Sequence, residues 1–211
     1  IKKKARLMTF TLGAKIPPLT VLKSYLGPDG KEVSAWPGVF SRDHMDIGSR
    51  FFIQQISQLN TLSGKIIDLG CGNGLLSLAC LQYFPKQEIE LILCDDSSLA
   101  IESAEMNLIA RGYTQAKLHH TDALLNVETR ADTILCNPPF HSGNRISTAA
   151  AERMFKQAAK LLAKDGQLLV IANRHLPYAP LLKKGFKSIQ QLNCDAKFVI
   201  YQCKDALPPK R

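Results

Sequence analysis

The sequence lacks the features that would place it in a membrane or outside the cell. No apolar run approaches the roughly 18 residues that a membrane-spanning helix needs, and the first residues carry no signal-peptide pattern. Internal repeats and low-complexity tracts are also missing. Hydrophobic residues still make up 45% of the 211 residues, which is enough for a folded core. The length suits one α/β domain with a small extension.

Cysteine pairs with the spacing of a metal or redox site are missing as well. The six cysteines never occur as C-x-x-C, so neither a zinc site nor a redox dithiol is predicted. His119-His120 has no neighbours that would complete a metal set, and we expect no metal. Free thiols without a secretion signal favour the reducing cytoplasm. The cysteines are Cys71, Cys80, Cys94, Cys136, Cys194 and Cys203.

Acidic residues are scarce relative to basic ones. Lysine and arginine total 27 against 18 aspartates and glutamates, which gives a formal net charge of +9. A basic domain attracts phosphate backbones through long-range steering and counterion release. The balance therefore favours a nucleic acid partner. Basic residues cluster at Lys2, Lys3, Lys4 and Arg6, at Lys183, Lys184 and Lys187, and at Lys210 and Arg211.

Residues 1–38 differ in pattern from the remainder. Short apolar runs alternate with Pro17-Pro18 and Gly27-Pro28, which indicate strands and turns. Asp29-Gly30 suits the turn of a hairpin between residues 25–26 and 32–33. We expect an interdomain linker or small β extension over residues 1–38 and the main domain over 39–211. Because the first residue is Ile1, we also expect a piece of a longer chain.

Apolar strands and helices alternate after this segment. Such alternation predicts an α/β fold with a mostly parallel sheet that is covered by helices on both faces. The expected strands are 66–69, 89–94, 116–120, 133–136, 168–172 and 197–202, and the expected helices are 51–59, 75–83, 97–111, 149–163 and 181–184.

A glycine-rich turn follows the first strand of this series, where residues 68–74 read DLGCGNG. Glycine permits positive φ and removes the Cβ that would keep a ligand from the backbone. The following helix directs its free N–H groups at the same place. The spacing of Gly70, Gly72 and Gly74 is G-x-G-x-G, and Leu75 stands where a dinucleotide fold has its third glycine. The turn therefore suits a nucleoside ligand other than NAD or FAD.

Acidic residues stand at three successive strand ends, where ligands bind in such sheets. Asp95 or its neighbour Asp96 lies about twenty residues past the glycine turn and suits two ribose hydroxyls. Asp122 could accept a hydrogen bond from an adenine amine, and Asp68 could anchor the turn or face a ligand ammonium. The set suits a ligand with an amino acid, a ribose and an adenine. The combination resembles the class I S-adenosylmethionine-dependent methyltransferases.

A rigid loop follows the fourth expected strand, where residues 137–140 read NPPF. An exocyclic base amine is a poor nucleophile, because its lone pair is delocalised into the ring. The side-chain oxygen of Asn137 and the carbonyl of Pro138 could accept from both of its N–H groups and favour the nucleophilic form. The prolines keep the loop rigid, and Phe140 could stack on a base that has been flipped out of a helix.

Three more sequence segments narrow the resemblance to one family of methyltransferases. Residues 38–43 (GVFSRD), 45–49 (MDIGS) and 172–176 (ANRHL), together with NPPFH, resemble the bacterial ribosomal RNA guanine-N2 methyltransferases of the RsmC/RlmG type. The resemblance covers residues 39–211. It implies S-adenosylmethionine as cofactor, a catalytic second domain here, and a degenerate methyltransferase-like first domain outside this chain.

The resemblance also implies roles for particular residues. Phe40, Asp46 and Gly48 would line the methionine end of the cofactor. The residues of the motifs described above complete the predicted cofactor site: Asp68, Gly70, Gly72, Gly74, Asp95, Asp122 and Asn137. Asn137, Pro138 and Phe140 would be catalytic, and Pro139, Phe140, His141 and Arg174 would contact the substrate.

Two other classes of function would use the same residues. The loop would also serve methylation of adenine N6 or of a glutamine amide in a protein, and a non-catalytic RNA-binding module would keep the fold alone. The basic charge favours RNA, so we expect ribosomal RNA or a ribosomal subunit as partner, a monomer, a cytoplasmic location and no membrane contact.

Overall fold

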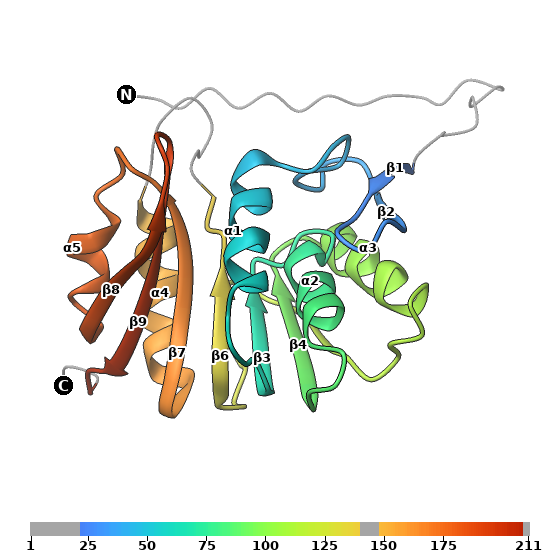
Figure 1. Cartoon of the computed structure of the whole chain (residues 1–211). Helices are drawn as coiled ribbons and strands as arrows, with labels where there is room; N and C mark the ends of the chain where they lie inside the picture. Colours follow the sequence, from blue (N-terminus) through green and yellow to red (C-terminus); the bar gives the residue numbers. More distant parts are fainter. Residues whose placement is uncertain (1–21, 140–147, 209–211) are drawn as a thin grey trace, which may run out of the picture.

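The computed structural model describes residues 22–139 and 148–208, and within them lie a seven-stranded sheet and a separate two-stranded hairpin (Figure 1). The hairpin pairs β1 (Lys23–Leu26) with β2 (Glu32–Ala35) in antiparallel register. This pairing confirms the turn that was predicted at Asp29-Gly30. The expected feature at Pro17-Pro18 lies outside the described residues.

The large sheet is mostly parallel, as the sequence predicts. Its strand order is β5-β4-β3-β6-β7-β9-β8, with parallel pairs from β5 to β7 and antiparallel pairs at β7–β9 and β9–β8. The strands are β3 (Gly64–Leu69), β4 (Ile89–Asp95), β5 (Lys117–His120), β6 (Ala131–Cys136), β7 (Leu162–Asn173), β8 (Phe186–Cys194) and β9 (Phe198–Ala206).

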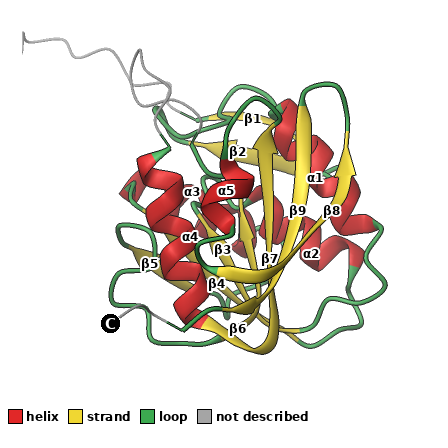
Figure 2. Cartoon of the chain, turned by 90° about the vertical axis from the view of Figure 1, so that its left-hand side faces the viewer, coloured by secondary structure: helices red, strands yellow, loops and turns green. Residues whose placement is uncertain are grey.

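Helices cover both faces of the sheet, because its strands carry buried apolar side chains on both sides. One face packs against α1, α2 and α3, and the other against α4 and α5. Figure 2 shows the sheet between α4 and α5 on one side and α1 and α2 on the other. The helices are α1 (Ile47–Ser57), α2 (Leu75–Tyr83), α3 (Ser98–Ile109), α4 (Ala149–Leu161) and α5 (Tyr178–Leu182).

The chain reverses its direction of travel across the sheet between β3 and β6. From β3 it proceeds outward through β4 to β5, and it then returns to β6 on the other side of β3 and continues to β7. In open α/β sheets a ligand crevice forms at such a switch point, outside the carboxyl ends of the strands. The glycine turn follows β3 and the NPPF loop follows β6, so this topology puts both at the same place.

Some expected elements were wrong in extent, and one was not predicted. The helix expected over 149–163 ends at Leu161, and β7 begins at once because Leu162 pairs with Ala131. The final helix lies at 178–182 rather than 181–184. Strand β8 was not predicted, because its sequence FKSIQQLNC is largely polar. It is an edge strand with only its first residue buried.

The hairpin is fastened to α3. The backbone N–H of Ser34 donates to the side chain of Asn107 at 2.8 Å, and Asn107 donates in return to the carbonyl of Ser34. Arg111 forms a nearly buried ion pair with Asp29 at 2.7 Å. These contacts hold the segment that follows the hairpin, residues 36–46, beside the carboxyl ends of the strands.

All six cysteines lie within the described residues, and all are free thiols, as expected. Five are buried in the sheet, its covering helices or the glycine turn, and Cys194 is exposed. Burial raises the pKa of the Cys94 and Cys203 thiols to about 12. In the described parts of the chain, no helix combines the length and apolar character that crossing a membrane would require.

Candidate functional site

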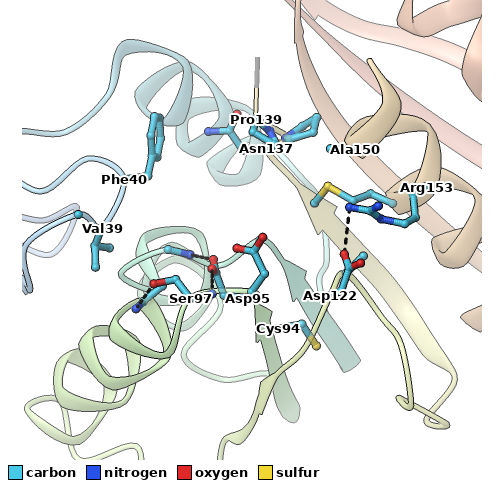
Figure 3. A pocket seen from close by; sticks show the side chains of 18 residues that line it. Val39, Phe40, Cys94, Asp95, Ser97, Asp122, Asn137, Pro139, Ala150 and Arg153 are labelled. Carbon is cyan, nitrogen blue, oxygen red and sulfur yellow. Dashed lines mark hydrogen bonds and ion pairs between the residues drawn. The ribbon is translucent and has the colours of Figure 1, made fainter. Parts of the chain in front are cut away.

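A cavity of about 270 Å³ opens at the switch point between β3 and β6. Figure 3 shows Asp95 and Asp122 on its floor, Val39 and Phe40 on one side, and Asn137 with Pro139 above. Segments that are distant in sequence therefore meet in one crevice. Its lining comprises residues 38–40, Gly70 and Gly72, residues 94–97, Ala100, Asp122 and Ala123, residues 137–139, Ala150, Arg153 and Met154.

The glycine turn is tied to the end of β4. The N–H groups of Gly70 and Cys71 both donate to the carbonyl of Cys94, at 2.8 and 3.0 Å. Gly70 and Gly72 have φ of 75° and 53°, in the left-handed region that favours glycine. Both line the cavity, so a ligand can approach the backbone there closely.

Asp95 is held rigidly at the centre of the floor. One of its carboxylate oxygens accepts from the N–H of Gly72 and the other from the N–H of Ser97, each at 2.9 Å. Burial raises the pKa of Asp95, and these two bonds oppose that rise. Each oxygen keeps a lone pair for a further donor, so the side chain can receive a pair of ligand hydroxyls.

Asp122 faces the cavity from the segment after β5 and is paired with Arg153 of α4. The guanidinium lies 3.1 Å from the carboxylate, and about half of each side chain is exposed (Figure 3). An exposed pair of this kind contributes only about 0–1 kcal/mol. A ligand amine can therefore reach Asp122 without a large energetic cost.

Asn137 projects from the end of β6 with its two amide atoms in different situations. The Nδ2 atom donates to the hydroxyl of Ser49 at 3.1 Å. The Oδ1 atom is buried and has no hydrogen-bond partner among the described residues. A buried acceptor without a partner costs about 1–3 kcal/mol, so this oxygen is ready for an incoming N–H group. Pro138 and Pro139 follow it along the wall of the cavity.

Asp68 lies beneath the glycine turn and does not line the cavity. Its side chain is 1% exposed, and its Oδ2 accepts from the N–H and the hydroxyl of Ser77 in α2. Burial raises its pKa to about 7, although the bonds from Ser77 favour the ionised form. Of the two predicted roles, the contacts match the anchoring of the turn.

Four other predicted residues lie outside the cavity lining. Asp46 is the N-cap of α1, and Gly48 lies against Phe198. Gly74 packs against α3, and Arg174 donates to the carbonyl of Asp195. Their parts in binding stay predictions. Phe140 and His141 fall outside the described residues.

Sequence reasoning missed one wall of the cavity. Ala150, Arg153 and Met154 line it from the first turns of α4. Their i, i+3, i+4 spacing puts them on one helix face. Because a helix was expected soon after the NPPF loop, this spacing could have predicted the wall. Ser49 belongs to the family-like segment 45–49 but was given no role, because its hydrogen bond to Asn137 joins residues that are 88 positions apart in the sequence.

Within the described residues, no three His, Cys, Asp or Glu side chains group as metal ligands.

Comparison with known proteins finds a matching family model and several relatives. Residues 30–202 match the model of the methyltransferase small domain family. A ribosomal RNA large subunit methyltransferase G of Alcanivorax borkumensis is 41% identical over 173 residues, which cover 81% of this chain and 44% of that protein. A ribosomal RNA small subunit methyltransferase C of Escherichia coli is 36% identical, with 82% and 49% coverage. The chain thus spans about half the length of these relatives.

A solved structure gives the same result for the fold. The T. thermophilus 16S rRNA N2 methyltransferase RsmC, in complex with AdoMet and guanosine, superposes with a TM-score of 0.77 at 28% identity. The match covers 90% of this chain and 52% of that one. The predicted class I methyltransferase fold is confirmed.

Proposed function

We propose that this chain, which belongs to the methyltransferase small domain family, transfers a methyl group from S-adenosylmethionine to the exocyclic N2 amine of a guanine in ribosomal RNA. The observation that carries the proposal is the Oδ1 atom of Asn137. It is a buried acceptor that no described residue engages, and its residue lines the same cavity as the glycine turn.

The residues of the cavity fit the proposed cofactor. Asp95 would hold the ribose hydroxyls, Asp122 the adenine amine, and the backbone at Gly70 and Gly72 would lie against the ligand. Phe40 would cover the methionine end, because it lines the cavity and is 57% exposed. Asp46, Gly48, Asp68 and Gly74 would support these contacts from behind the lining. When bound, S-adenosylmethionine supplies a methyl group that its sulfonium already activates.

The loop after β6 would prepare the amine for attack. Asn137 Oδ1 and the Pro138 carbonyl accept from the two N–H groups, and this stabilises the amine as positive charge develops on its nitrogen. Holding the nitrogen in line with the methyl group supplies the remaining rate enhancement. Pro139, Phe140, His141 and Arg174 are proposed to contact the base and its neighbours.

The proposal extends to the surroundings of the domain. We propose ribosomal RNA or a ribosomal subunit as partner, a cytoplasmic location, and a monomer with a further methyltransferase-like domain beyond this chain. Coverage of about half of each relative supports the further domain. We also propose that residues 1–38 form an extension and 39–211 the methyltransferase domain.

The test is methyl transfer from labelled S-adenosylmethionine to small- and large-subunit ribosomal RNA transcribed in vitro. Substitution N137A should lower the transfer rate by about 100-fold or more, since the acceptor acts in the transition state. Cofactor affinity measured by calorimetry should change little. N60A removes an exposed asparagine far from β6 in sequence and is the matched control.

Four results would contradict the proposal. Full activity of N137A would remove Asn137 from the reaction. Incorporation of label into protein rather than RNA would indicate glutamine methylation, and label at adenine would indicate N6 methylation. A protein that binds RNA but no S-adenosylmethionine would be a non-catalytic module.

A further inference from the structure

We infer that Ser49 is a positioning residue, which orients the amide of Asn137 so that its oxygen faces the crevice. The inference rests on the proposed function and adds a residue of α1 to its machinery. It starts from the contact between Asn137 Nδ2 and Ser49 Oγ at 3.1 Å, which joins the first turn of α1 to the loop after β6.

The two ends of the Asn137 amide require different surroundings. Its nitrogen carries two donors and its oxygen two acceptor sites. Only the oxygen can accept from a target amine, so the nitrogen must point away from the crevice. The Ser49 hydroxyl satisfies the nitrogen on the α1 side, and this leaves the buried Oδ1 without a partner in the described part of the chain. If the amide rotated so that its nitrogen faced the crevice, the hydrogen bond from Asn137 Nδ2 to Ser49 Oγ would be broken.

Ser49 is itself held by several contacts. Its side chain is 5% exposed, and its backbone N–H donates to the Asp46 carboxylate at 2.9 Å. The N–H of Asp46 donates to the hydroxyl of Ser41 at 2.9 Å. A chain of hydrogen bonds therefore runs from the segment that carries Phe40 to Asn137.

Gly48 lets the first turn of α1 approach the sheet. A Cβ at this position would lie 3.1 Å from the ring of Phe198, at the start of β9. The close approach brings Ser49 within reach of the strand end. Asp46 and Gly48, which the family resemblance associates with the cofactor, thus also determine where the Ser49 hydroxyl lies.

Substitution S49A tests the inference in the full chain. We expect the single-turnover rate of methyl transfer to ribosomal RNA to fall about tenfold, which corresponds to the loss of one positioning hydrogen bond. Affinity for S-adenosylmethionine and for RNA should change less than about twofold. S49T retains the hydroxyl and should recover most of the rate. S57A removes an exposed hydroxyl of the same helix, bonded at 2.8 Å to Gln54, and should leave the rate unchanged.

A double variant separates positioning from a general loss of packing. If Ser49 acts through Asn137, S49A should have no further effect on the rate of an N137A protein. An additional tenfold loss in that background would overturn the inference, as would an S49A protein with the wild-type rate.

A measurement without RNA keeps the inference independent of the proposed function. In nitrogen–proton correlation spectra, the side-chain amide of Asn137, assigned by its absence from N137A, should be protected from exchange and should lose that protection in S49A but not in S57A. An unchanged Asn137 signal would overturn the role of Ser49. A wild-type protein that keeps this signal but methylates no RNA would contradict the proposed function instead.

Discussion

Asp68 shows how burial changes the chemistry of a single residue. Its Oδ1 atom has no partner among the described residues, and Oδ2 accepts two hydrogen bonds from Ser77. Removal from water is the main cause that raises its pKa to about 7, and the charge of Asp95 adds to it. Near neutral pH the protonated form is therefore substantially populated.

This pKa predicts a pH-dependent stability with a definite sign. The folded protein binds the proton more tightly than the unfolded chain, whose value is near 3.8. The stabilisation is complete below pH 3.8 and is lost as the pH rises to about 7. D68N should remove this contribution, so the wild-type free energy of unfolding should fall relative to D68N by up to about 1.4 kcal/mol per pH unit.

Urea unfolding of both proteins between pH 4 and 8 measures that difference. D165N, a change at an exposed position of β7 where φ is already positive, controls for the change in charge. A difference between wild type and D68N that is constant with pH would mean that Asp68 stays ionised in the folded protein.

At the residue scale, the sequence predicts the chemistry of a site better than the position of each side chain. Asp95, Asp122 and Asn137 were predicted to meet because they lie at or just after the ends of strands that share one edge of the sheet. Arg153 and Ser49 were not found. Both contact a partner in another element, and a single sequence carries no signal for such a pair.

At the element scale, the turn between β3 and α2 combines two requirements for glycine. Gly74 has φ of 81°, and a Cβ there would lie 3.2 Å from the Cβ and 3.3 Å from the Cα of Ala104 in α3. Gly30 in the hairpin has a similar φ of 73° but open space around it. Substitutions at Gly74 and Gly30 therefore separate the cost of a strained backbone from the cost of close packing.

We expect G74A to destabilise the protein by about 2–3 kcal/mol and G30A by about 1 kcal/mol. The larger loss reflects displacement of α3 in addition to the strained φ. Denaturant midpoints and slopes measure both values. Equal losses would show that conformation alone requires glycine at position 74.

Prediction of elements succeeded where burial gave a clear pattern. The parallel strands have continuous apolar runs, and the hairpin has a turn dipeptide between two short strands. Strand β8 has neither feature, because an edge strand with an exposed surface is free to be polar. Its pairing with β9 is decided by neighbours in the sheet rather than by its own residues.

At the scale of the whole molecule, the excess of basic charge determines how binding should respond to salt. Binding of the proposed RNA partner to a chain with a net charge of +9 would release counterions from the phosphate backbone. RNA affinity should therefore fall at least about tenfold between 50 and 200 mM salt. Fluorescence anisotropy with a labelled ribosomal RNA fragment measures it.

Affinity for S-adenosylmethionine, measured at the same salt concentrations, is the internal control. This affinity should change little, because the proposed hydrogen bonds from the cofactor to the carboxylates of the cavity act at short range. An RNA affinity that is insensitive to salt would indicate recognition through stacking and base edges instead of charge.

The arrangement of the cysteines confines thiol reactivity to one place. Five thiols are buried, and Cys194 is exposed at the end of β8. Because β8 runs parallel to β7, this residue lies on the edge of the sheet that carries the crevice, beyond the two strands β7 and β9. A maleimide dye attached there would lie on the same edge of the sheet as the cavity without occupying it. The native chain thus offers a ready handle for a fluorescent reporter, with no engineered substitution.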